Sequence, residues 1–202
     1  MSQLPILHRV RWRTLPLLVL LWVVPVPVVA QAPTPQWTVG LAVGGAFSRV
    51  RRDRETARGG ANVALAWRIM YHVSDHAALG IHAGATPSRL PGEGRARRRG
   101  FAGVYPAVEW HPDAEHWVAA GVGLHLDAPV FYDVRPRTPG EARFRVGLGG
   151  MVAAARRIST PSTGYSAGEV VARAWAGRVH TTDGRLSGWA TALLAGGRFA
   201  PE

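Results

Sequence analysis

The chain of 202 residues, of which 47% are hydrophobic, is long enough to bury a sizeable core and needs no second domain to do so. The absence of cysteine excludes disulfide bonds and thiolate metal sites, so packing and backbone pairing must supply the stability. The formal net charge of +11 comes from 24 basic residues, all of them arginine, against 13 acidic residues, and it favours an anionic partner.

The N-terminal segment has the three parts of a secretory signal peptide. Residues 1–14 carry three arginines and no acid, residues 15–30 form an apolar run of 16 residues, and an Ala-Gln-Ala sequence follows. A membrane anchor is the alternative, but Pro25 and Pro27 interrupt a run shorter than the ~20 residues that a spanning helix needs. We expect residues 1–32 to be cleaved on export. The loss of three arginines then lowers the formal charge of the mature domain, residues 33–202, to +8.

The first segment of the mature chain, residues 37–50, alternates between bulky apolar and small residues. Trp37, Val39 and Leu41 lie on one side, and the intervening positions carry threonine, glycine, alanine and serine. A period of two predicts a β-strand. A water-facing strand would usually place long polar side chains on its second face, so this small face indicates a different environment.

The next two segments, residues 62–73 and 78–86, repeat this alternation on either side of a polar Ser-Asp-His sequence at residues 74–76. The pattern predicts a hairpin with a tight connection. Five further strands are predicted at residues 100–111, 117–127, 143–155, 169–180 and 186–199. The fourth, seventh and eighth strands are less regular, the fourth because Pro106 removes a ladder donor. Eight strands of this length match the ~9–11 residues that cross a bilayer at a tilt.

The connections alternate in length. Residues 51–59, 87–99 and 128–141 are long and polar, whereas residues 74–76 and 112–116 are short. This alternation is typical of an up-and-down barrel with one compact end. Two connections depart from it, the long one at residues 156–167 and the short one at residues 181–185.

The leader, the eight alternating strands, the turns YHVSDHA and WHPDAEHW with their flanking aromatics, and the late Phe199 together resemble small bacterial outer-membrane β-barrels of the OmpA-transmembrane, OmpX and OmpW type. The resemblance covers residues 37–199 and is architectural. It implies an all-β, eight-stranded antiparallel up-and-down transmembrane barrel in the bacterial outer membrane, placed there by the outer-membrane insertion machinery. In that family the last residue is usually aromatic, whereas here Ala200, Pro201 and Glu202 follow Phe199.

The resemblance also implies how side chains are distributed. Aromatic girdles would include Trp37, Tyr71, Trp110 and Trp117 at the periplasmic interface, and Phe47 and Trp189 at the outer one. A narrow lumen would hold a packed polar network rather than a wide pore. The residues expected to face it are Arg68, His82, Glu109, His125, Arg143, Arg145 and Arg173. Since isolated charges are costly there, we expect arginines to pair with Glu109, Asp127 or Glu169.

The long connections are rich in arginine, which binds phosphate bidentately. In the outer membrane these groups would face the phosphates of lipopolysaccharide, and the residues concerned are Arg51, Arg52, Arg54, Arg95, Arg97, Arg98 and Arg99. A solvated arginine-rich surface is the competing interpretation. No aromatic platform accompanies these charges, so we expect no nucleic-acid partner. The histidines near the two short turns match no zinc pattern, and we expect neither metal nor cofactor.

The function predicted from these features is that of a non-enzymatic outer-membrane barrel, structural or adhesive, with arginine-rich outer loops that contact lipopolysaccharide. Two alternatives stay open. One is a lipid A-modifying enzyme, an acyl hydrolase or acyltransferase, with a rim site drawn from Ser48, Ser187, His180 and Asp183. The other is a soluble periplasmic lipocalin-like carrier, whose faces would be reversed, with apolar residues inside and polar residues outside.

Overall fold

The computed structural model describes residues 37–52, 58–89, 98–129, 145–158, 166–181 and 184–199. None of these residues belongs to a helix long and apolar enough to cross a membrane. They form eight strands, namely β1 (Trp37–Arg52), β2 (Arg58–Ser74), β3 (Ala77–Arg89), β4 (Arg98–Trp110), β5 (His116–Pro129), β6 (Arg145–Arg157), β7 (Ser166–Thr181) and β8 (Gly184–Phe199).

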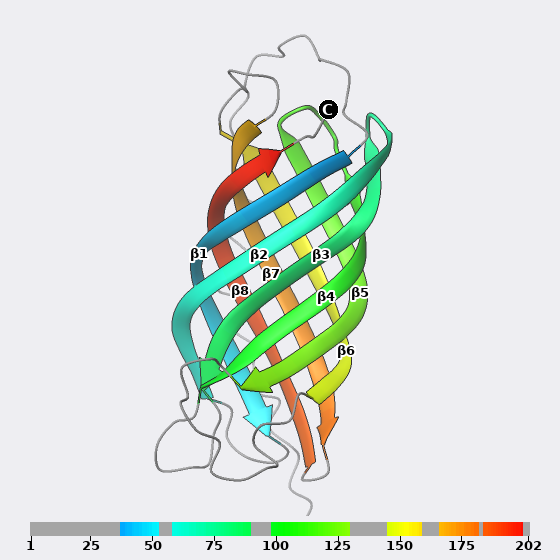
Figure 1. The fold of residues 1–202 in the computed structure, drawn as a ribbon. Helices are drawn as coiled ribbons and strands as arrows, with labels where there is room; N and C mark the ends of the chain where they lie inside the picture. The colour runs from blue at the N-terminus through cyan, green and yellow to red at the C-terminus, as the bar shows by residue number, and fades with distance from the viewer. Residues whose placement is uncertain are drawn as a thin grey trace, which may run out of the picture.

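Each strand pairs antiparallel with the next, and β1 pairs with β8, so the sheet closes on itself (Figure 1). The closing register places Val39 opposite Phe199 and Arg51 opposite Ser187. The predicted all-β, eight-stranded antiparallel up-and-down barrel is therefore confirmed. Closure leaves no unpaired strand edge, which is the condition for strands to cross a lipid phase.

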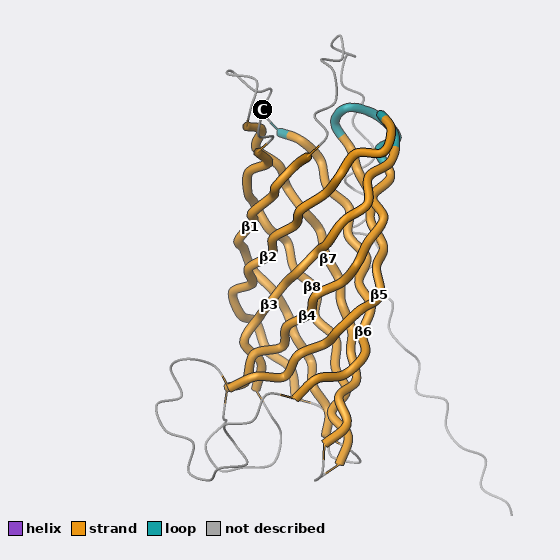
Figure 2. The backbone as a smooth tube through the Cα atoms, turned by 45° about the vertical axis from the view of Figure 1, so that its right-hand side comes forward, coloured by secondary structure: helices purple, strands orange, loops and turns teal. Residues whose placement is uncertain are grey.

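The two ends of the barrel differ. At the end that we call the turn end, short connections join β2 to β3 and β4 to β5 (Figure 2). The backbone N–H of His111 in the second connection donates to the carbonyl of His76 in the first at 2.8 Å. At the opposite end, called the far end, β1, β3 and β5 finish at Arg52, Arg89 and Pro129. The connections that follow these three strands lie outside the described residues.

The turn between β4 and β5 is organised by Asp113. Its Oδ1 accepts hydrogen bonds from the backbone N–H groups of Glu115 and His116, both at 2.8 Å, and lies 2.9 Å from Nδ1 of His116. Partial burial raises the pKa of the Asp113 carboxyl, but these hydrogen bonds lower it by a larger amount. The pKa is therefore below its usual value. This local hydrogen bonding is the usual way in which aspartate fixes a tight turn.

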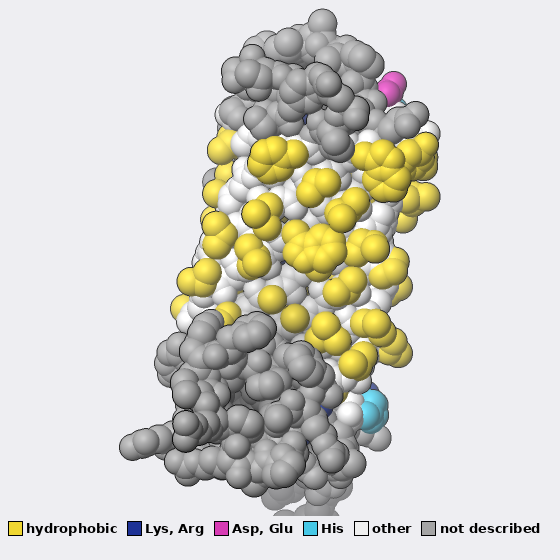
Figure 3. Space-filling view, in the orientation of Figure 1, with side chains coloured by type: hydrophobic (Ala, Val, Ile, Leu, Met, Phe, Trp, Pro, Cys, Tyr) yellow, Lys and Arg dark blue, Asp and Glu magenta, His cyan; other side chains and the backbone are white. Residues whose placement is uncertain are grey.

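The outer wall is apolar. Along residues 37–51 of β1 and 61–73 of β2, exposed positions alternate with buried or half-buried ones, with Leu41 52% and Leu65 48% exposed, while Ala42 and Ala66 are buried. Apolar side chains are spread over the visible wall, and no arginine, aspartate or glutamate interrupts its middle (Figure 3). This is the reverse of a soluble carrier, whose outer face must be polar.

The interior is narrow, and glycine on one strand makes room for a large side chain from another. A Cβ on Gly40 would meet the Arg68 side chain 2.8 Å from its Nε, and a Cβ on Gly177 would overlap the His125 ring. The small face predicted from the sequence is therefore the inner face. Large polar side chains fill the space that it leaves, as expected when eight strands enclose an interior just wide enough for side chains.

Candidate functional site

Arg68 on β2 is the centre of a buried ion-pair network near the turn end. Its Nη1 donates to Oε1 of Glu109 on β4 at 3.1 Å, and its Nη2 donates to both carboxylate oxygens of Glu169 on β7, at 2.8 and 3.0 Å. All three side chains are almost completely buried. One guanidinium thus links three strands through the lumen and compensates two charges where water is scarce.

Further donors complete the hydrogen bonding of these carboxylates. Nε2 of His82 lies 2.8 Å from Oε1 of Glu109, and Nε2 of His111 lies 3.2 Å from Oε2. Trp117 donates from Nε1 to Oε2 of Glu169 at 3.0 Å, and the Arg68 guanidinium lies 4.1 Å from the centroid of the Trp117 ring. Every carboxylate oxygen has a donor within reach, so the network fixes one arrangement of the strands around it.

A smaller cluster adjoins the network at the turn end. Nε2 of His72 lies 3.2 Å from Nη2 of Arg198 and 3.3 Å from Oγ1 of Thr38. A guanidinium can only donate, so Nε2 of His72 is the acceptor of the Arg198 bond. The ring centroids of His72 and His111 are 5.1 Å apart, which places the two clusters side by side.

The middle of the lumen, around Arg173, differs from the turn end in having a buried arginine without a carboxylate partner among the described residues. Arg173 donates from Nη1 to the carbonyl of Ala83 at 2.7 Å, and its guanidinium lies 5.7 Å from the centroid of the Trp175 ring. Among the described residues no carboxylate pairs with Arg173. Its Nε and Nη2, the Tyr105 hydroxyl and Nε1 of Trp175 make no hydrogen bond to the described part of the chain. This layer therefore carries a positive charge that no carboxylate of the described residues neutralises.

The predicted lumen residues can now be placed. Arg68, His82, Glu109, His125 and Arg173 are buried inside the barrel. Arg145, the first residue of β6, is half-buried, and Arg143 lies outside the described residues. Arg68 pairs with both Glu109 and Glu169, which agrees with the expectation that an isolated charge in the lumen would be costly. Residues that the sequence reasoning missed are Thr38, Tyr105, Trp175 and Arg198, which also face inward.

The prediction for Trp117 is wrong. It was expected at the periplasmic girdle, but its side chain is 4% exposed and lies in the lumen, where it contacts both Arg68 and Glu169. The indole N–H finds a carboxylate there, and the ring meets a guanidinium, which together favour the inside over the lipid interface. Trp37 and Trp110 are exposed on the outer wall near the turn end, as expected.

The candidates for catalysis lie on two sides of the barrel wall, because Ser48 is inside whereas Ser187 and His180 are diagonal neighbours on the outer face. Ser48 is buried inside the barrel, where its Oγ donates to the carbonyl of Pro87 and accepts from Asn62. His180 is exposed on β7 and, by the alternation of that strand, faces outward. Ser187 on β8 also faces outward, and Asp183 lies outside the described residues. The wall of the barrel therefore separates Ser48 from His180.

The arginines predicted to meet lipopolysaccharide lie mostly beyond the described side chains. Arg51 is exposed on the outer wall at the far end of β1. Arg52, Arg98 and Arg99 belong to strands, but their side chains are outside the described set, as are the residues Arg54, Arg95 and Arg97. In the described strands and turns, no group of three or more histidine, aspartate or glutamate side chains gathers as a metal site would require.

Fold and site together define a class of architecture, since a closed eight-stranded barrel with an apolar outer wall and hydrogen-bonded charges inside is the arrangement of small transmembrane β-barrels. No protein-family model matches the sequence, and no curated protein matches it. Among solved structures, the chain is similar to the attachment invasion locus protein Ail of Yersinia pestis, with 13% identity and a TM-score of 0.49 over 81% of this chain and 99% of that one. It is also similar to Neisserial surface protein A, with 11% identity and a TM-score of 0.48 over 82% and 97% of the two chains.

Proposed function

We propose that the chain is a non-enzymatic protein of the bacterial outer membrane, structural or surface-binding, that contacts lipopolysaccharide through arginines at its far end. It reaches the membrane by a signal peptide, residues 1–32, that is cleaved on export, and the outer-membrane insertion machinery assembles it. The far end is the outer end, because the long connections of such barrels face the outside and the short turns face the periplasm.

The observation that supports this proposal is a contrast in how charges are compensated. Near the turn end inside the barrel, Arg68 is matched by Glu109 and Glu169, which favours a structural role for this part of the interior over a pore. On the outer wall at the far end, Arg51 has no carboxylate partner among the described residues, and the chain carries an excess of arginine over acid. Unmatched guanidinium groups at the outer leaflet suit phosphate.

Cell fractionation tests location, and gel electrophoresis of the outer-membrane fraction with and without boiling tests the barrel. We expect a band in that fraction whose mobility changes on heating. A soluble periplasmic protein without such a change would refute the proposed location.

The lipopolysaccharide contact is tested by neutralising the longest run of arginines to glutamine, at Arg95, Arg97, Arg98 and Arg99. Purified wild-type barrel in detergent should retain labelled lipopolysaccharide, and the variant should retain less while keeping its heat-dependent mobility. Added salt should weaken the contact, since exposed charges are screened. Equal retention by both proteins, at low and high salt, would mean that this surface is only solvated.

A further inference from the structure

The outer wall at the far end brings three arginines around one serine. In the register of the sheet, Arg178 on β7 lies opposite Ser187 on β8, and Ser187 lies opposite Arg51 on β1. Arg178 and Arg51 are exposed and Ser187 is half-buried, and all three face outward. Neighbouring strands are about 4.8 Å apart, so the two arginine Cα atoms flank Ser187 at a span of roughly 10 Å. Arg49, also exposed, lies two positions before Arg51 on the same face.

These cations stand at the far-end border of the apolar wall, and His180 lies two positions beyond Arg178 on the same face. Among the described residues, no carboxylate pairs with Arg49, Arg51 or Arg178, and their neighbours in register include Leu148 and Trp189. Arginine on the lipid face of a barrel is costly at the midplane and tolerated near the interface, where its charge can meet lipid headgroups. Two guanidinium groups that flank a hydroxyl form a donor set suited to a phosphate group.

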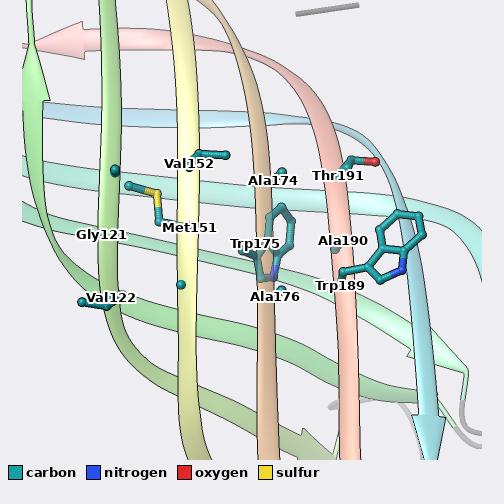
Figure 4. A pocket seen from close by; sticks show the side chains of 12 residues that line it. Gly121, Val122, Met151, Val152, Ala174, Trp175, Ala176, Trp189, Ala190 and Thr191 are labelled. Atoms are coloured by element: carbon teal, nitrogen blue, oxygen red, sulfur yellow. The ribbon is translucent and has the colours of Figure 1, made fainter. Parts of the chain in front are cut away.

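An apolar groove of about 660 Å³ adjoins this cluster on its turn-end side. Figure 4 shows the side chains that line the groove. Its outer positions form two rows across β5 to β8, and small residues at Gly150, Ala174 and Ala176 hollow the wall between larger side chains. The row nearer the far end finishes at Trp189, which lies opposite Arg49 in the register of β8 and β1. The groove therefore ends where the arginines begin.

We propose that the arginine cluster and the groove together form a binding site for a phosphorylated lipid of the outer leaflet, lipid A. A phosphate would lie between Arg51 and Arg178 at Ser187, and an acyl chain would lie in the groove. The inference rests on the proposed lipopolysaccharide contact and assigns it to the barrel wall rather than to the loops. A second copy of the chain suits the face less well. A two-fold contact would set the same unmatched arginines against each other, whereas an amphiphile with a phosphate and acyl chains complements both parts.

The test is a titration of fluorescent lipid A into the refolded full barrel in detergent micelles, with dephosphorylated lipid A as the second ligand. The double variant Arg51→Gln/Arg178→Gln should bind lipid A about tenfold or more weakly, the loss of roughly one good charged contact. Its affinity for the dephosphorylated lipid should equal that of the wild type. A double variant that binds lipid A as tightly as the wild type would overturn the inference.

The groove is tested separately. Ala176→Leu fills it without touching the arginines and should weaken lipid A binding, whereas Ala172→Leu adds the same volume at an outward position of β7 that is not part of the lining. Equal binding by the two alanine variants would overturn the acyl-chain assignment. The heat-dependent mobility of every variant confirms its fold.

The outcomes also separate this inference from the proposed function. If neutralising the loop arginines abolishes lipid A binding while Arg51→Gln/Arg178→Gln does not affect it, the proposed function stands and the wall site is refuted. If the wild-type barrel binds no lipid A, both fail.

Discussion

Replacing Arg68 with methionine should be among the most damaging single changes in the barrel. The substitution keeps much of the aliphatic volume but removes the guanidinium that donates three hydrogen bonds to Glu109 and Glu169. Both carboxylates stay buried. Glu109 keeps its two histidine contacts, and Glu169 keeps only the indole N–H of Trp117. Removing one partner of a buried ion pair costs about 3–5 kcal/mol, because an uncompensated charge is left behind.

Arg173→Met is the matched control. Arg173 is as deeply buried as Arg68, but it has no carboxylate partner among the described residues and donates only to the Ala83 carbonyl. Losing one neutral acceptor costs about 1 kcal/mol, and removing an uncompensated buried charge offsets that cost. We therefore expect a change in unfolding free energy close to zero, of either sign, although the two arginines have similar burial.

Urea titration of the barrel refolded in lipid vesicles provides the measurement, with folded protein quantified by its faster mobility in unheated samples. The triple variant Arg68→Met/Glu109→Gln/Glu169→Gln should recover most of the loss, because no charge remains to be compensated. Similar losses for Arg68→Met and Arg173→Met, or no recovery in the triple variant, would refute the account of the interior as a charge-matched network.

Three further predictions concern the lipid-facing wall, the packing of the lumen and the turn between β4 and β5. Leu65→Arg, on the lipid face near the middle of β2, should make insertion less favourable by about 2–4 kcal/mol, and normal insertion into vesicles would contradict the assignment of faces. Gly177→Ala should cost about 1–3 kcal/mol by overpacking, and that cost should fall in a His125→Gly background, which removes both the ring and the Cβ that lies 2.6 Å from the added methyl group. An equal cost in both backgrounds would show that the side chain of His125 does not occupy that space. Asp113→Ala should lower the urea midpoint at pH 7. Since folding lowers the pKa of this carboxyl, its contribution is complete above the ordinary value near 4 and is lost as the pH falls through the lowered value, so the difference from wild type should shrink toward pH 3.

The architecture was predictable because alternation over a dozen residues leaves little freedom. In β1 and β2, a register slip of one residue would exchange every bulky side chain with a small one, so the pattern from Trp37 to Val43 and from Val63 to Val73 fixes both strand and face. The same rule placed Arg68 and His82 inside. The alternation does not predict which inward residues contact one another. Arg68 and Glu169 are 101 residues apart in the sequence and come together only because the barrel closes with a particular stagger of its strands.

The error at Trp117 has a specific cause. Strict alternation along β5 puts Trp117 on the same face as His125, which was correctly expected inside, whereas the position of Trp117 at a strand end suggested a girdle aromatic. The periodicity was the better guide. In β7 the outward positions carry Ala172, Ala174 and Ala176, and the large side chains face inward, so the rule that bulky residues face lipid gives no clear answer there. Large side chains can turn inward where neighbouring strands contribute glycine and alanine to the lumen.

The distribution of arginine separates structural from interacting charges. In the turn-end half of the lumen, Arg68 compensates two buried carboxylates and lies against an aromatic ring. Among the described residues, neither a carboxylate nor an aromatic ring pairs with Arg51 or Arg178 on the outer wall at the far end, although an acidic side chain at Ser187 would reach both. An arginine that serves only the stability of the barrel would gain from such a partner. Two arginines that flank a small hydroxyl instead keep their N–H donors available for an anionic group of a membrane lipid. A phosphate-binding site requires this arrangement.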